Sequence, residues 1–207
     1  GLRFTLHYAG QSRQVQLHMP GVHGVMTALA AASAGCAAHM AFDDICNALE
    51  SLRPAKGRGE IKAGPNGSTL IDDTYNANRQ SILAMLATMK STKLSATGKR
   101  WAVLGDIFEL GQYAPEEHIA CGKEMAGTID YLLAIGDEAR FFAEGAVQAG
   151  MQEKNIHCFR ADVDNMKELE AAKQAAANVL KREVHSEDLV LLKGSRGMRM
   201  ETMLRML

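Results

Sequence analysis

Polar and charged side chains follow three of the strands that the sequence predicts. Such positions matter because parallel α/β sheets bind their ligands at the carboxyl ends of the strands, beside helix N-termini. The loops offer carboxylates and amides after two of the strands, and two cations around a Gly-Ser backbone after the third, which would suit an anion. They are, in chain order, Asp73–Asn78, Gly105–Gly111 and Lys193–Gly197. Together they predict one crevice at the edge of a sheet.

Each of these residues also has a purely structural interpretation. Asp73 and Asp106 could each do no more than form a turn. Asn76 or Asn78 could cap the helix that follows, and Ser195 could cap the last helix of the chain. The hypothesis of a site therefore depends on their shared position at strand ends.

Two histidines are weaker candidates. His118 lies one turn into a predicted helix, where Glu117 and His118 could act as an acid/base pair, although a lone surface histidine is more common. His23 lies at a helix start and could contact a ligand, cap the helix or pack against it. The remaining histidines have no metal-ligand spacing.

The composition is that of an ordinary globular protein. In 207 residues, 47% are hydrophobic and 23% charged, and the net charge of -1 provides no global attraction for nucleic acid or an acidic membrane surface. No apolar run approaches the ~18 residues of a membrane span, and no signal pattern opens the chain. The four cysteines lack paired spacing, which favours reduced thiols in a cytoplasmic protein.

Two familiar phosphate-binding motifs are missing from the sequence. Neither G-x-x-x-x-G-K-[ST] nor a G-x-G-x-x-G that opens a helix after a strand occurs. If the protein handles a nucleotide, we expect its main phosphate-binding loop to lie outside these residues. The 207-residue chain alone is then expected to be inactive.

The beginning of the chain predicts a small, incomplete unit. Residues 1–19 alternate as a β-hairpin does, with a turn at Ala9-Gly10-Gln11-Ser12. Helices follow over His23–Ala38 and Asp44–Ser51, the second capped by Asp43. The stretch Arg53–Gly59 has no apolar period, which indicates a boundary between domains 1–57 and 58–207.

Residues 58–207 predict one α/β domain with a doubly wound, mainly parallel sheet. Strands and helices alternate, and strands such as Leu189–Leu192 are continuously apolar, as in sheets covered on both faces. A last helix over Met198–Met206 spaces four methionines for core packing. The other elements are a hairpin of Glu60–Ala63 and Ser68–Asp72, helices Gln80–Met89, Pro115–Ala126, Glu138–Ala149 and Val163–Leu180, and strands Arg100–Leu104, Tyr131–Ile135 and Ile156–Phe159.

Several short runs, in their order along the chain, resemble the Mur ligase family. They are Leu70-Ile71-Asp72-Asp73-Thr74-Tyr75-Asn76-Ala77-Asn78, Val103-Leu104-Gly105-Asp106, Glu109-Leu110-Gly111, His118, and Leu192-Lys193-Gly194-Ser195-Arg196 with Met200-Glu201. The resemblance implies that 58–207 is the family's Rossmann-like C-terminal domain and that 1–57 is the tail of its central ATP-binding domain. It also implies part of a ligase that uses ATP and Mg²⁺ to join D-alanyl-D-alanine to UDP-N-acetylmuramoyl-tripeptide through an acyl phosphate, in peptidoglycan precursor synthesis.

The same resemblance implies roles for individual residues. Arg58 would reach ATP phosphate, Asp73 would hold the ribose hydroxyls, and His23 would also contact the nucleotide. The crevice between nucleotide and amino substrate would be lined by Asn76, Asn78 and Ser81. The D-alanyl-D-alanine side would be formed by Asp106, Lys193, Ser195 and Arg196, whose cations suit a carboxylate, and His118 would be a possible catalytic residue. The main phosphate and metal sites are expected in upstream domains that this chain lacks, and the protein is expected to be a monomer.

The chain departs from the family pattern at a few positions. The family has a His-Asn pair with a second Asn three residues on, where this chain has Gly24 and Thr27, so the adenine contacts are left without a predicted donor. Arg79 replaces a usual proline, which adds a cation and removes a rigid turn. Gly197 stands where a serine is common.

Two other functions are compatible with parts of the pattern. Asp72, Asp73, Asp106 and Lys193 could form a phospho-receiver-like regulatory module, in which carboxylates bind Mg²⁺ and lysine reads an aspartyl phosphate. Against it, Asp106 ends the very next strand, and the first 57 residues have no place in such a module. A third possibility is another amino-acid-adding ligase of the same superfamily, which the Tyr75-Asn76-Ala77-Asn78 run disfavours.

Overall fold

The computed structural model describes residues 1–19 and 21–207, and they divide into two compact units, Gly1–Ala55 and Lys56–Leu207. The sequence places the boundary two residues later, after residue 57. Among the described residues, no helix is long and apolar enough to cross a bilayer.

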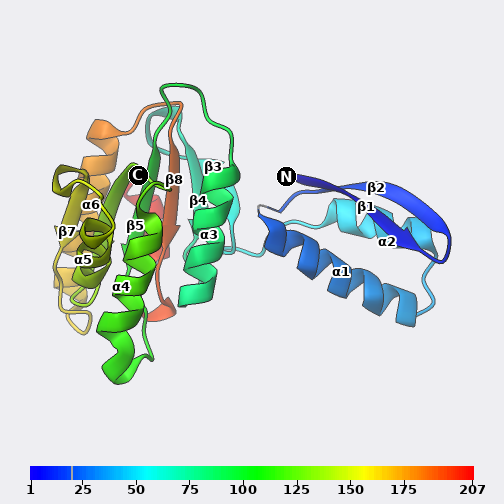
Figure 1. The fold of residues 1–207 in the computed structure, drawn as a ribbon, viewed down its shortest axis with the longest axis horizontal. Helices are drawn as coiled ribbons and strands as arrows, with labels where there is room; N and C mark the ends of the chain where they lie inside the picture. Colours follow the sequence, from blue (N-terminus) through cyan, green and yellow to red (C-terminus); the bar gives the residue numbers. More distant parts are fainter. Residues whose placement is uncertain (20) are drawn as a thin grey trace. The chain divides into compact units, whose positions relative to one another are not determined.

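The smaller unit is a hairpin packed against two helices (Figure 1). β1 (Leu2–Tyr8) pairs antiparallel with β2 (Gln11–Leu17), and Ala9 and Gly10 between them have φ of 48° and 80°, as a two-residue type I′ turn requires. The apolar face of the hairpin packs against α1 (Val22–Ala37) and α2 (Phe42–Ser51). The buried residues of this small core are Leu6, Val15, Leu17, Ala28, Ala32, Ile45, Cys46 and Leu49.

Asp43 does not cap α2, which corrects the prediction. The helix begins earlier, with Ala41 at the cap position, because Phe42 packs on the core of the unit. Asp43 lies in the first turn, where a carboxylate still interacts favourably with the helix N-terminus. Its side chain also pairs with Arg13 at 3.4 Å.

The larger unit contains a six-stranded sheet of order β3-β4-β8-β5-β6-β7. β3 is antiparallel to β4, and all the other neighbours are parallel, which confirms the predicted mainly parallel sheet. The strands are β3 (Glu60–Ala63), β4 (Thr69–Asp73), β5 (Arg100–Gly105), β6 (Tyr131–Ile135), β7 (Ile156–Phe159) and β8 (Leu189–Lys193).

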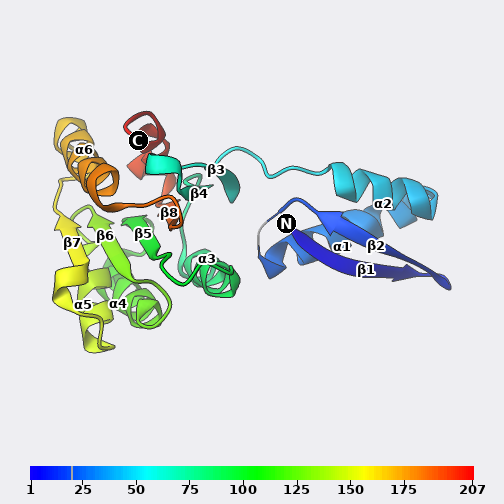
Figure 2. The same ribbon diagram turned by 90° about the horizontal axis from the view of Figure 1, so that it is seen from above.

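Helices cover both faces of this sheet, as Figure 2 shows. α3 (Arg79–Ser91), α4 (Ala114–Met125) and α5 (Arg140–Gln148) pack on one face, and α6 (Met166–Glu183) packs on the other. The larger unit also contains short 3₁₀ segments, which are η1 (Pro65–Gly67), η2 (Gly111–Tyr113), η3 (Glu153–Asn155), η4 (Arg196–Met198) and η5 (Met200–Arg205). The chain after β8 returns to the α6 face, whereas β4 and β5 lead to helices on the opposite face.

The last segment is not the predicted α-helix over Met198–Met206. Two 3₁₀ turns replace it, separated by Arg199 in the left-handed conformation (φ 47°, ψ 45°). The carbonyl oxygen of Arg199 accepts from the Thr202 amide at 3.0 Å and from the ammonium of Lys173, a fully buried residue of α6, at 3.2 Å. Met198, Met200 and Met203 are nevertheless fully buried, so the predicted core role is confirmed for them.

Candidate functional site

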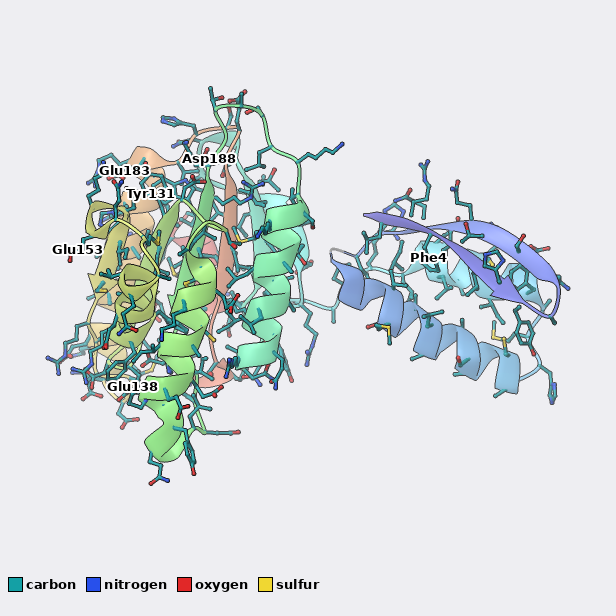
Figure 3. The ribbon with its side chains drawn as sticks, viewed as in Figure 1. Phe4, Tyr131, Glu138, Glu153, Glu183 and Asp188 are labelled. Atoms are coloured by element: carbon teal, nitrogen blue, oxygen red, sulfur yellow. The ribbon has the colours of Figure 1, made fainter. Side chains whose placement is uncertain are left out.

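The parallel strands bring the predicted site residues to one end of the sheet. In register, Asp73 of β4 lies opposite Lys193 of β8, and Lys193 lies opposite Leu104 of β5. Figure 3 shows that the parallel strands point the same way. Glu138, which follows β6, lies at one end of the domain, and Tyr131, which begins β6, and Asp188, which precedes β8, lie at the other end. The loops after β4, β5 and β8 therefore meet at the same edge.

A buried ion pair joins two of these loops. Lys193 is 2% exposed, and its Nζ lies 2.5 Å from Asp73 Oδ2 and donates to the Asn76 carbonyl oxygen at 2.9 Å. Burial lowers the pKa of Lys193, Asp73 acts in the opposite direction, and the nearby charge of Arg58 adds to the lowering. Lys193 is thus committed to Asp73 and Asn76 and fixes the β4 loop against the end of β8.

Two arginines flank an exposed tyrosine beside this ion pair. The Arg58 guanidinium lies 4.0 Å from the centre of the Tyr75 ring and that of Arg196 lies 5.7 Å from it. Tyr75 is 44% exposed, and both arginines are exposed. Stacked guanidinium groups at a strand end can bind phosphate or carboxylate through paired N–H donors.

Backbone contacts fix the tyrosine and its neighbour. The Tyr75 amide donates to the Gly57 carbonyl oxygen at 2.9 Å, and Gly57 has φ of 70°, which favours glycine. The Arg196 amide donates to Asn76 Oδ1 at 3.3 Å, and the Arg196 side chain pairs with Glu201 at 2.9 Å. The sequence analysis did not name Tyr75 as a site residue, although an aromatic residue within a polar run at a strand end could have indicated it.

Asn78 and Ser81 form the capping box of α3, as the structural interpretation of Asn78 proposed. Asn78 Oδ1 accepts from the Ser81 amide at 2.8 Å, and Ser81 Oγ accepts from the Asn78 amide at 3.1 Å. Arg79 pairs with Glu117 of α4 at 3.2 Å. These residues hold the N-terminus of α3 beside the site.

Asp106 faces a different loop. It is 2% exposed, and its Oδ2 accepts from the amides of Asp137 and Glu138 at 3.1 and 3.3 Å, while Oδ1 has no partner. Burial raises the pKa of Asp106 to about 6. The carboxylate occupies the place before α5 where α/β proteins often bind an external anion, so the β4–β8 edge is the better candidate for a phosphate site.

A pocket of about 670 Å³ lies next to Asp106, among the loops that follow β5, β6 and β7. Its lining is rich in carboxylates, and its arginine, Arg160, pairs with Asp137 at 2.9 Å. The lining residues are Asp106, Phe108, Asp137, Glu138, Arg160, Ala161, Asp162, Val163 and Glu168. The sequence analysis did not predict this pocket, although acidic residues after two predicted strands could have indicated it.

Ser195 and His118 both hold the backbone of the β5 loop. Ser195 stands at the cap position of η4, but its side chain makes no capping bond, and its Oγ instead accepts from the Phe108 amide at 2.8 Å. His118 is fully buried and not a surface histidine: its Nε2 accepts from the Ile107 amide at 3.0 Å and its Nδ1 lies 2.7 Å from the Ala114 carbonyl oxygen. Burial lowers the pKa of His118, in keeping with a neutral ring.

The remaining nucleotide candidates lie in the smaller unit. The backbone of His23 is in the first turn of α1, and its side chain lies outside the described residues. Gly24 packs closely on the hairpin, because a Cβ there would lie 3.1 Å from side-chain atoms of Leu17 and Met19.

The receiver-like alternative requires its carboxylates to converge, and they have separate partners. Asp72 is fully buried and bonds to Thr74 Oγ1 at 2.6 Å and to Lys62 Nζ at 2.5 Å. Asp73 and Asp106 bind Lys193 and the β6 loop respectively. Among the side chains that the structure describes, no group of three or more from His, Cys, Asp or Glu could hold a metal ion.

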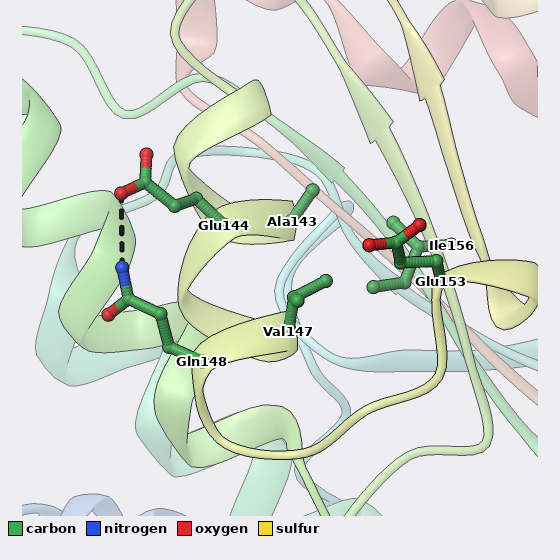
Figure 4. A pocket seen from close by; sticks show the side chains of 6 residues that line it. All are labelled: Ala143, Glu144, Val147, Gln148, Glu153 and Ile156. Atoms are coloured by element: carbon green, nitrogen blue, oxygen red, sulfur yellow. Dashed lines mark hydrogen bonds between the residues drawn. The ribbon is translucent and has the colours of Figure 1, made fainter.

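A further hollow of about 450 Å³ lies at the opposite end of the domain (Figure 4). It is formed by the last turns of α5 and by the η3 segment that leads into β7, with Glu144 and Gln148 hydrogen-bonded at 3.0 Å on its rim. None of the predicted site residues lines it, so it is not part of the candidate site.

The fold and the strand-end cluster define a doubly wound α/β domain with a polar site at the carboxyl edge of its sheet. Residues 57–196 match the family model described as "Mur ligase, glutamate ligase domain". The chain belongs to the Mur ligase family.

Curated relatives match nearly the whole chain. It is 32% identical over 206 residues to the UDP-N-acetylmuramoyl-tripeptide--D-alanyl-D-alanine ligase of Bacillus subtilis (strain 168), covering 99% of this chain and 42% of the relative. The protein of the same name from Escherichia coli (strain K12) is 30% identical, with 100% and 42% covered. The chain thus spans less than half the length of these relatives.

Solved structures agree with this assignment. A crystal structure of MurF from Acinetobacter baumannii superimposes with a TM-score of 0.81 at 30% identity, covering 98% of this chain and 41% of that one. MurF ligase from Thermotoga maritima, in complex with ADP, has a TM-score of 0.74 at 22% identity, covering 98% and 44%, which shows the common fold.

Proposed function

We propose that this chain is the C-terminal part of a ligase that uses ATP to join D-alanyl-D-alanine to UDP-N-acetylmuramoyl-tripeptide. The names of the relatives that match its whole length support this activity. The structural observation that carries it is the Arg58–Tyr75–Arg196 stack beside the buried Asp73–Lys193 pair. This arrangement presents two exposed guanidinium groups, a carboxylate and an amide side chain at one sheet edge.

The proposed reaction proceeds in two balanced steps. A carboxylate oxygen of the tripeptide attacks the γ-phosphorus of ATP, and ADP leaves. The amine of D-alanyl-D-alanine then attacks the acyl carbon, and inorganic phosphate leaves with one former carboxylate oxygen while the nitrogen loses a proton to solvent. Fixed cations favour both steps because negative charge develops on the transferred and departing phosphate.

The residues divide between the two substrates. Arg58 contacts ATP phosphate, and Asp73, oriented by Lys193, accepts hydrogen bonds from the ribose hydroxyls. Asn76 and Arg196 lie toward the incoming dipeptide, whose carboxylate suits a guanidinium. Asn78 and Ser81 shape this edge through the N-terminus of α3, and the buried Lys193 acts through Asp73.

The ligase that we propose extends beyond this domain. Residues 1–55 are the end of a central ATP-binding domain, in which His23 is a nucleotide contact. Mg²⁺ and the main phosphate loop belong to parts of the ligase outside this chain. The enzyme acts as a cytoplasmic monomer in peptidoglycan precursor synthesis.

A ligation assay with the full-length protein tests the activity. ADP release should require both UDP-N-acetylmuramoyl-tripeptide and D-alanyl-D-alanine, and L-alanyl-L-alanine should serve as the inactive control. With ¹⁸O in the tripeptide carboxylate, one labelled oxygen should appear in the released phosphate. Equal ADP release without the dipeptide, or with single amino acids in its place, would overturn the proposal.

The chain by itself provides a second test. Because neither phosphate-loop motif occurs in it, residues 1–207 should show no ADP release with the same substrates. Turnover by the 207-residue chain would mean that the ATP site is complete within it and that the proposed division of labour is wrong.

A further inference from the structure

The loop after β5 bonds to three other parts of the domain through three consecutive residues. Asp106 accepts the two amides that precede α5, the Ile107 amide donates to His118 of α4, and the Phe108 amide donates to Ser195 after β8. We call Asp106, Ile107 and Phe108 the 106–108 segment.

Its link to the β8 loop is reciprocal. The Ser195 amide donates to the Asp106 carbonyl oxygen at 3.1 Å, while Ser195 Oγ accepts from the Phe108 amide at 2.8 Å. The two loops also touch through glycines, because a Cβ on Gly194 would lie 3.2 Å from the Gly105 Cα. The position of Ser195, and of Arg196 directly after it, is therefore set by the 106–108 segment.

His118 is the buried side chain that holds the centre of this segment. Its ring packs against Phe142 of α5 at 4.6 Å between ring centres, and no part of it is exposed. Nδ1 donates to the Ala114 carbonyl oxygen of its own helix, so Nε2 is left as an acceptor for the Ile107 amide. Ile107 is 3% exposed, which leaves its amide no access to water as a replacement.

We propose that His118 is a positioning residue of the ligase: its neutral ring fixes Ile107, and through the 106–108 segment and Ser195 it aligns Arg196 with the amino substrate. This inference rests on the proposed function for its consequence in the reaction. His118 makes no proton transfer, because both ring nitrogens are bonded within the protein.

Several charged groups act on His118. Glu138, two residues before α5, and Glu117 on its own helix favour its protonated form, and Arg79 of α3 pairs with Glu117 at 3.2 Å. Asp106 lies one residue before its partner Ile107. Protonation of Nε2 would remove the acceptor and release the segment, so the alignment should weaken in acid.

Two variants separate positioning from general stability. His118→Gln places an amide oxygen where Nε2 accepts, whereas His118→Leu fills similar space without an acceptor. In the 207-residue chain, His118→Leu should speed hydrogen exchange at the amides of Ile107 and Phe108 about tenfold relative to Leu133 of β6, in line with the loss of one buried hydrogen bond. His118→Gln should restore most of the protection.

A pH series adds a readout that simple destabilisation would not move. After correction for intrinsic exchange, protection of Ile107 should fall in acid, below the usual pKa range of histidine, and it should fall less in His118→Gln, where only the neighbouring Asp106 still titrates. In the full-length ligase, His118→Leu should raise KM for D-alanyl-D-alanine more than KM for ATP, and His118→Gln should reverse this. Uniform loss of protection across β5 and β6, or no rescue by glutamine, would overturn the inference. If the exchange results are as predicted but the full-length protein does not ligate D-alanyl-D-alanine, only the proposed function is contradicted.

Discussion

At the scale of single residues, the site contains two carboxylates with opposite surroundings. Asp73 pairs with Lys193 and precedes by two residues Tyr75, whose ring is flanked by the Arg58 and Arg196 guanidinium groups. Asp106 is buried against backbone amides and has one oxygen without a partner. Because of this contrast we propose Asp73 as a ligand contact and Asp106 as an internal support.

Asp106 should make stability depend on pH in a defined direction. Its pKa is raised to about 6 in the folded chain from 3.8, so its protonated form contributes stability below pH 4 that is lost as pH rises through 6. Asp106→Asn mimics the protonated group. We expect the free energy of unfolding of this variant to exceed that of the natural chain by about 2–3 kcal/mol at pH 7.5 and to be nearly equal to it at pH 4.

Urea unfolding of the larger unit at these two pH values measures this difference. Asp164→Asn is the matched control, since Asp164 is exposed and should shift neither value. A lower stability of Asp106→Asn at pH 7.5 would mean that the buried carboxylate is stabilised by the α5 N-terminus and not strained by burial.

At the scale of elements, α4 and α5 pack with their backbones in close contact. A Cβ on Gly145 of α5 would lie 2.1 Å from the Ile119 carbonyl oxygen, and one on Gly122 of α4 would lie 2.2 Å from the Phe142 carbonyl oxygen. These glycines let α4, which carries His118, lie directly against α5. The contact thereby supports the 106–108 segment, which His118 holds through Ile107.

Gly145→Ala should therefore destabilise the domain. Helix propensity alone would raise stability by about 1 kcal/mol, but the added methyl group must displace backbone, which costs about 1–3 kcal/mol or more. We expect a net loss that thermal denaturation can detect. Ala175→Gly in the exposed part of α6 provides the control and should lose about 1 kcal/mol through propensity alone; a stabilised Gly145→Ala would show that the helices can separate without cost.

Sequence patterns predicted these elements well where local features decide. Apolar strands indicated the parallel sheet, and Asn78, one of two asparagines that could cap the next helix, does cap it. The helix predicted for the last segment was wrong because the conformation of this segment depends on Lys173, which lies in α6 and donates to the Arg199 carbonyl oxygen. A partner so distant in sequence leaves no local pattern.

The same reason separates the site residues that were predictable from those that were not. Strand ends were enough to gather Asp73, Asn76 and Lys193 into one region. The Asp73–Lys193 pair itself requires β8 to lie between β4 and β5, and strand order is set by packing of the whole sheet. Sequence therefore predicted the site's location better than its internal contacts.

At the scale of the whole molecule, the two units differ in their capacity to fold. The larger has two apolar layers around its sheet, whereas the core of the smaller has only eight buried residues among those described, and leaves Met26 at 64% and Met40 at 46% exposed. Domains this small are marginal unless something else covers them.

Residues 56–207 should accordingly fold alone. We expect calorimetry of this fragment to show one cooperative transition within a few degrees of the main transition of the 207-residue chain. Residues 1–55 alone should show no cooperative transition. A large drop in the melting temperature of 56–207 would mean that the two units depend on one another for stability.

In our proposal, the reaction uses the β4–β8 edge of the sheet and not the acidic pocket beside β6 and β7. Steady-state kinetics of the full-length ligase with Asp73→Asn and Asp162→Asn tests it most directly, because the two changes are chemically identical and lie in the two competing places. We predict that Asp73→Asn lowers kcat/KM for ATP at least about tenfold, equivalent to about 1.4 kcal/mol of transition-state stabilisation, while Asp162→Asn stays within about twofold, equivalent to about 0.4 kcal/mol. Unchanged ATP kinetics in Asp73→Asn, or the larger loss in Asp162→Asn, would contradict the account.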